Sequence, residues 1–86
     1  MGGEKRLSIS IAYLGEMMDS LSPVEQRIAR YFIDHRDELT ATPILQVAEA
    51  CQTSKSAVVR LCKRMGYGGY KDFLTSLSAE LALMRH

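Results

Sequence analysis

Apolar residues recur along most of this chain at intervals of three and four positions, the period of an amphipathic α-helix. The alternating pattern of a half-buried strand is nearly absent. We therefore expect an all-α protein: a five-helix bundle with short loops. The first helix is expected within residues 1–20, beginning at Ser8 or Ser10. Its apolar stripe would consist of Leu7, Ile11, Leu14, Met18 and Leu21.

The second helix has a strong opening signal in the segment SPVEQ, residues 22–26. Ser22 can cap the helix, Pro23 suits its first position, and Glu25 stands where a capping box needs a carboxylate. The buried face would hold Val24, Ile28, Tyr31 and Phe32. We expect this helix to end around residues 35–37.

A short third helix is predicted by TATP at 40–43, with Thr42 as its cap and Pro43 as its first residue. Its buried side would hold Ile44, Val47, Ala48 and Cys51. The segment CQTS, residues 51–54, then separates it from the next helix, which is the spacing of a helix-turn-helix. Ala48 is small where the two helices would cross. Gln52 stands where such turns commonly hold glycine, so we expect a left-handed or distorted residue there.

The fourth helix is expected from Lys55 to Met65, capped by Ser54, with Val58, Leu61 and either Cys62 or Met65 facing inward. Gly66 suits the left-handed residue that follows a helix, and Tyr67 can fold back over the last turn. After the GYGGY turn, a final amphipathic helix is marked by Tyr70, Phe73, Leu74, Leu77 and Leu81. This order of elements predicts a homeodomain-like bundle.

Charge is distributed unevenly, although the net charge is only +1. Residues 1–50 contain five basic and eight acidic side chains, and residues 51–86 contain six and two, giving net charges of −3 and +4. Residues 53–70 carry four positive side chains and no negative one. This asymmetry indicates that the C-terminal half contacts a polyanion.

Once its apolar residues point inward, the fourth helix leaves on its outer or flanking faces Ser54, Lys55, Ser56, Val59, Arg60, Lys63 and Arg64. Hydroxyl groups and helix N–H groups can bind phosphate or base edges, and arginine can bind guanine through two hydrogen bonds. A merely solvated face would place acidic partners four residues away, and this helix has none. We therefore predict double-stranded DNA as the partner, with this helix in the major groove.

The predicted DNA-binding residues are Thr53, Ser54, Lys55, Ser56, Arg60, Lys63, Arg64 and Lys71. Arg60, in the middle of the helix, is predicted to reach base edges. Lys71, beyond the turn, is predicted to contact phosphate. The alternative is a helical protein-interaction module that docks an acidic protein through the same basic helix.

The segment LSPVEQRIARYFIDHRDEL, followed by ILQVAEACQTSKSAVVRLCKRMGYGGYKDF, resembles the N-terminal domain of RpiR-family bacterial transcriptional regulators. Its most specific part is VVRLCKRMGY followed by GGYKDF. The resemblance implies one helix-turn-helix domain over 1–86 with a family-like core over 21–82, regulating sugar or sugar-phosphate metabolism. It implies DNA contacts by Ser54, Lys55, Ser56, Arg60 and Lys63. Pro43 departs from the family, which usually has a serine cap there.

Members of that family usually carry a C-terminal sugar isomerase-like domain, which binds a phosphosugar and controls DNA binding. Residues 1–86 contain no counterpart of it. We therefore expect the chain to be an excised domain of a longer regulator, with a free-standing domain as the alternative. A phosphosugar effector would act only through the domain that these residues lack.

Other functional classes find little support in these residues. No carboxylate pair, nucleophile–base pair or metal cluster stands at local spacing, so we expect no enzyme, metal or cofactor. Cys51 and Cys62 are too far apart for a metal knuckle or a redox motif, and we interpret them as small buried hydrophobes. No apolar run is long enough to span a membrane or to form a signal peptide, so we expect a cytoplasmic protein.

We also expect weak homodimerisation. One recognition helix reads only a few base pairs, whereas a two-fold pair reaches grooves one turn, ~34 Å, apart. The first helix carries more apolar residues than one narrow stripe requires, so some of them are candidates to face a partner chain. These are Ile9, Ile11, Leu14, Met17, Met18 and Leu21. The alternative is that all of them pack in the core of the monomer.

Overall fold

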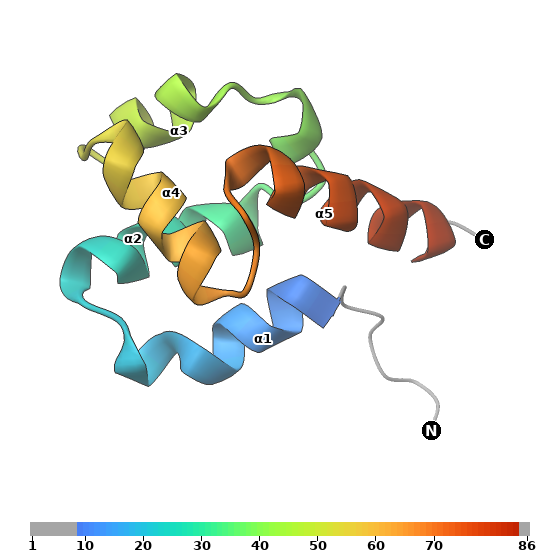
Figure 1. Cartoon of the computed structure of the whole chain (residues 1–86), viewed down its shortest axis with the longest axis horizontal. Coiled ribbons are helices and arrows are strands. Elements are labelled where there is room, and N and C mark those ends of the chain that lie inside the picture. Colours follow the sequence, from blue (N-terminus) through green and yellow to red (C-terminus); the bar gives the residue numbers. More distant parts are fainter. Residues whose placement is uncertain (1–8, 85–86) are drawn as a thin grey trace.

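The computed structural model describes residues 9–84, and within that range every regular element is helical. The α-helices are α1 (Ile9–Met17), α2 (Pro23–Asp34), α3 (Ile44–Ala50), α4 (Lys55–Arg64) and α5 (Tyr70–Met84). Single 3₁₀ turns, η1 (Met18–Ser20) and η2 (Leu39–Ala41), follow α1 and precede α3. Figure 1 shows α1 on one side of the bundle and α3 on the other, with α2, α4 and α5 between them. The predicted all-α, five-helix architecture is confirmed. Leu7 and Ser8 lie outside the described residues.

The capping box of α2 forms as predicted. The Ser22 hydroxyl accepts a hydrogen bond from the Glu25 N–H (3.2 Å), and the Glu25 carboxylate accepts one from the Ser22 N–H (3.0 Å). The helix ends at Asp34, slightly earlier than predicted, because His35 leaves the helical conformation as the C-cap. The His35 ring stacks on Tyr31 at a centroid distance of 4.1 Å.

The predicted cap of α3 is wrong. The Thr42 hydroxyl donates backwards to the Glu38 carbonyl (2.8 Å) instead of accepting from α3. Pro43 stands in extended conformation at the N-cap position, so it precedes the helix rather than forming its first residue. The Tyr70 hydroxyl of α5 donates to the Thr42 carbonyl at 2.8 Å, which fixes the start of α3 from another part of the chain.

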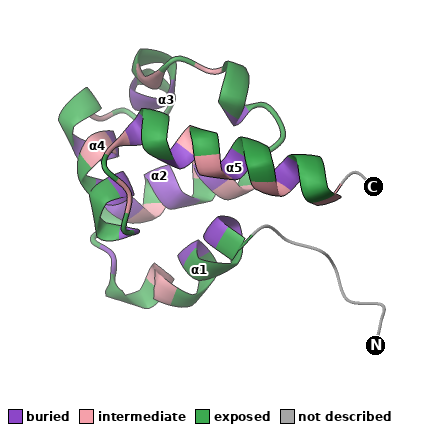
Figure 2. Cartoon of the chain, turned by 45° about the vertical axis from the view of Figure 1, so that its right-hand side comes forward, coloured by how far each residue is buried: buried purple, intermediate pink, exposed green. Residues whose placement is uncertain are grey.

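One cluster of buried side chains holds the helices together. The rings of Phe32 and Phe73 are fully buried and stack at 4.8 Å, with Tyr67 5.5 Å from Phe73. Figure 2 shows the buried positions running through α2 and along one side of α5, while exposed positions cover the outside. Burial, with smaller effects from Cys62 and Tyr31, raises the pKa of Tyr70 to about 12, so its hydroxyl remains a donor at neutral pH. No helix within residues 9–84 is long and apolar enough to cross a membrane.

Cys51 and Cys62 are both free and buried, as the sequence indicated. Burial raises the pKa of the Cys62 thiol to about 12. Burial also raises the pKa of Cys51, against a smaller lowering effect of Arg27. Both thiols are therefore protonated at neutral pH, and a protonated thiol is a poor nucleophile.

The turn between α3 and α4 has the left-handed residue that the sequence predicted. Gln52 has φ of 56°, and Thr53 donates its N–H to the Ala48 carbonyl at 2.9 Å. The Arg27 side chain on α2 donates to the Cys51 carbonyl at 3.0 Å. A left-handed non-glycine residue costs roughly 1–2 kcal/mol, and these contacts offset that cost.

The end of α4 is closed by a Schellman motif. Gly66 has φ of 103°, its N–H donates to the Lys63 carbonyl, and the Tyr67 N–H donates to the Cys62 carbonyl, both at 3.0 Å. Met65 is the C-cap, so α4 ends one residue before the predicted Met65. Tyr67 packs against the core, with its ring 5.5 Å from that of Phe73 in α5.

Candidate nucleic-acid interface

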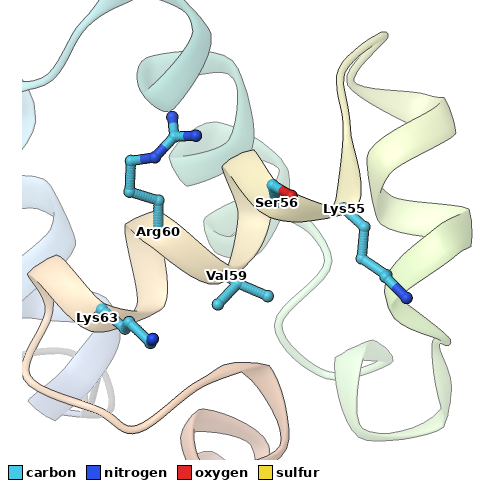
Figure 3. A pocket seen from close by; sticks show the side chains of 5 residues that line it. All are labelled: Lys55, Ser56, Val59, Arg60 and Lys63. Atoms are coloured by element: carbon cyan, nitrogen blue, oxygen red, sulfur yellow. The ribbon is translucent and has the colours of Figure 1, made fainter.

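The outer side of α4 combines cationic, hydroxyl and apolar groups around a shallow hollow. Ala57, Val58, Leu61 and Cys62 are buried, which anchors α4 to the rest of the bundle. A hollow of about 320 Å³ on the opposite side is lined by Lys55, Ser56, Val59, Arg60 and Lys63. These five residues are called here the α4 face. Apart from the half-buried Val59, these residues are exposed. Figure 3 shows Arg60 extending to one side of the helix and Lys55 and Val59 to the other.

The start of α4 presents hydrogen-bonding groups close to the α4 face. The Ser54 hydroxyl accepts from the Ala57 N–H at 3.2 Å, so the predicted cap is confirmed. The proton of that hydroxyl is not used in this bond and remains available for an acceptor. Thr53 is half-buried beside it. No acidic residue stands in the first turn of α4, where the helix dipole favours an anion.

Arg64 lies apart from the other predicted DNA-binding residues. Its guanidinium donates to the Ser20 carbonyl at 3.2 Å, and its Nε lies 3.8 Å from a Glu25 carboxylate oxygen. The side chain therefore binds the corner between α1 and α2 and retains 42% exposure. Its DNA contact stays a prediction, and the structure gives Arg64 a second role in holding the end of α4.

Lys71 lies beyond the turn that follows α4, in the first turn of α5. It is exposed and lines a separate hollow of about 520 Å³ with Gly68, Gly69, Tyr70, Asp72 and Thr75. The Asp72 carboxylate accepts from the Gly68 N–H at 2.7 Å, so this carboxylate stabilises the glycine-rich turn. The structure thus places Lys71 outside the α4 face but on the element that directly follows it.

Val59 is the one member of the α4 face that is not among the DNA-binding residues predicted from the sequence. An apolar residue contributes nothing to a charge pattern, and its exposure depends on how α4 is turned toward the bundle. The sequence already places Val59 on an outer or flanking face of this helix, and its spacing, four residues after Lys55 and four before Lys63, is the signal that could have added it to the DNA-binding residues.

The family model for the rpiR-type helix-turn-helix domain matches residues 9–83. The chain belongs to the RpiR family. The match includes α1, which precedes the stretch on which the resemblance was recognised. In this RpiR-type domain the helix-turn-helix consists of α3, the turn around Gln52, and α4.

Similar proteins agree with this assignment. An HTH-type transcriptional regulator of Providencia stuartii is 34% identical over 67 residues, 78% of this chain and 24% of its own length. The N-terminal domain of the Bacillus subtilis transcriptional regulator ybbH has a TM-score of 0.79 and 26% identity, covering 88% of this chain and 93% of that one. Vibrio vulnificus NanR, complexed with ManNAc-6P, has a TM-score of 0.83 and 31% identity, covering 90% and 29%. The chain spans about a quarter of the length of the curated regulators that it matches.

Proposed function

We propose that this RpiR-type domain binds double-stranded DNA sequence-specifically by placing α4 in the major groove. The observation that carries the proposal is the α4 face, which combines three exposed cations with a hydroxyl group on the second helix of a helix-turn-helix. Arg60 is the candidate for base contact, while Lys55 and Lys63 flank it on the same helix. We propose a binding function alone, without a catalysed reaction.

Selection of bound duplexes from a random pool tests this proposal. A preferred duplex should emerge and should bind far more tightly than scrambled DNA at the same salt concentration. A protein-docking module would also be sensitive to salt, but it would show no preference among duplexes. Equal affinity for selected and scrambled duplexes would overturn the proposal in favour of that alternative.

The regulatory role is proposed from the relatives. NanR is complexed with a sugar phosphate, ManNAc-6P, which supports a regulator of sugar or sugar-phosphate metabolism. Because this chain spans about a quarter of its curated relatives, we place effector binding in other parts of such a regulator. With DNA as the partner, we propose that the protein acts in the cytoplasm.

Replacement of Lys71 by alanine should weaken all duplexes by a similar factor. An exposed ammonium group near the start of α5 can neutralise a phosphate, and phosphates are the same in every sequence. The affinity should be measured over a range of salt concentrations. The slope of its logarithm against the logarithm of the salt concentration should decrease by about the amount that one phosphate contact contributes. Lys71→Arg retains the charge and should retain the slope. A loss confined to the preferred duplex would contradict the phosphate assignment.

We further propose weak pairing of two copies through α1. Ile11, Leu14 and Leu21 are buried in the monomer, and Met17 and Met18 pack against its core. Of the predicted candidates, Ile9 is the one that is largely exposed, at 78%, and Tyr13, one helical turn later, is 45% exposed. These two side chains give the proposed pairing surface, and the buried ones belong to the fold.

The double variant with Ile9→Ser and Tyr13→Ser should remain monomeric at concentrations where the unchanged chain pairs. Removing two exposed apolar groups weakens association but leaves the core intact, so the unfolding temperature should change little. Analytical ultracentrifugation and thermal denaturation measure the two effects. Leu45→Ser is the matched control, because Leu45 is also exposed, at 59%, but lies on α3. A monomeric unchanged chain, both free and on DNA, would remove the proposal.

A further inference from the structure

Val59 is an apolar side chain in the middle of a polar, cationic face. It is the one apolar residue among the five that line the hollow on α4. Lys55 and Lys63 stand one helical turn before and after it, and Figure 3 shows its two methyl groups directed away from the helix between them. An isolated surface valine is ordinary, so its meaning depends on what surrounds it.

Packing in the hydrophobic core does not account for Val59, which is half-buried. The neighbouring Val58, Leu61 and Cys62 are fully buried, whereas Val59 is not among the half-buried apolar side chains that pack against the core. Valine also has a lower helix propensity than alanine or lysine, because branching at Cβ restricts its rotamers. Neither the core nor helix propensity therefore gives a reason for valine at this half-buried position.

The major groove offers one apolar feature on its base edges, the C5-methyl group of thymine. We propose that Val59 contacts the C5-methyl of a thymine in the preferred DNA site and is thereby a specificity-determining residue. This inference rests on the proposed DNA-binding function and extends it from the cationic residues to an apolar one. Val59 and Arg60 are consecutive, with a rise of about 1.5 Å. Because the two side chains extend to different sides of the helix (Figure 3), the thymine should lie within a few base pairs of the base that Arg60 contacts, and not at the same base pair.

Replacing thymine by deoxyuridine removes that methyl group and leaves the base-pairing edge unchanged. Each thymine of the selected duplex is replaced in turn, and the dissociation constant is measured for every substituted duplex. At one thymine per half-site the replacement should weaken binding about fourfold, the effect of one buried methyl group. With Val59→Ala the same replacement should have a clearly smaller effect, because the two γ-methyl groups that reach the thymine are gone.

Leu83→Ala is the control variant, since Leu83 is 75% exposed near the end of α5, outside the α4 face. It should retain the full deoxyuridine effect. A selected duplex in which no thymine depends on its methyl group would overturn this inference alone. Retention of the full deoxyuridine effect by Val59→Ala would also overturn this inference alone. Absence of any preferred duplex would overturn the proposed function and this inference together.

Discussion

Arg60→Ala should weaken binding to the preferred duplex by about 1–3 kcal/mol, or roughly five- to 150-fold, with a much smaller loss on scrambled DNA. Arg60 is exposed in the middle of α4, and its guanidinium extends away from the helix (Figure 3). An arginine in that place can donate two parallel hydrogen bonds to guanine O6 and N7. Titrations of both duplexes at one salt concentration measure the difference.

Arg60→Lys separates charge from geometry. Lysine retains the positive charge but lacks the planar pair of donors. We expect binding to scrambled DNA and the salt slope to be retained, while the preference for the selected duplex decreases. If Arg60→Ala weakens both duplexes equally, Arg60 binds phosphate and is not a base reader.

Phe73→Ala should lower the free energy of unfolding by about 3–5 kcal/mol. Phe73 is fully buried, and its ring lies against Phe32 of α2 and Tyr67 of the turn after α4. Its removal leaves a cavity where three segments meet. Since a small domain has only about 5–15 kcal/mol of stability, this loss is at least a fifth of the total. Thermal and urea denaturation followed by circular dichroism provide the measurement.

Two controls accompany this variant. Phe73→Leu fills much of the cavity, so it should lower the free energy of unfolding considerably less than Phe73→Ala does. Leu83→Ala, at an exposed position, should change stability by no more than about 0.5 kcal/mol. A loss below about 1 kcal/mol for Phe73→Ala would show that the structure collapses around the missing ring, contrary to our assignment of Phe73 as a central core residue.

Features that depend on neighbouring residues were predictable from the sequence, and features that depend on distant contacts were not. The caps at Ser22 and Ser54 and the left-handed Gly66 are determined within a few residues, and all three are confirmed. Thr42 carries the same local signal as Ser54. Its carbonyl, however, is bound by Tyr70 of α5, and its hydroxyl turns back to Glu38.

The same distinction applies to the site. The cationic character of α4 follows from its composition, so Lys55, Arg60 and Lys63 were identifiable directly. The partner of Arg64 is a carbonyl 44 positions earlier in the chain, which no local pattern reveals. The sequence also places Val59 on an outer or flanking face of this helix, but a charge pattern does not mark an apolar residue as a DNA contact, and its place beside the three cations comes from the structure.

The contacts at the two ends of α4 have a consequence for the rate of binding. Arg27 holds the turn before the helix, and Arg64 holds its end against the α1–α2 corner. A recognition helix held at both ends in this way is preorganised, so association requires no folding step and little backbone rearrangement. With the proposed DNA contacts, the remaining entropy cost would fall on the long side chains of Lys55, Arg60 and Lys63, at about 0.5–1.5 kcal/mol for each one immobilised. Encounter with DNA should then be limited by diffusion and electrostatic attraction, and the lifetime of the complex should distinguish one sequence from another.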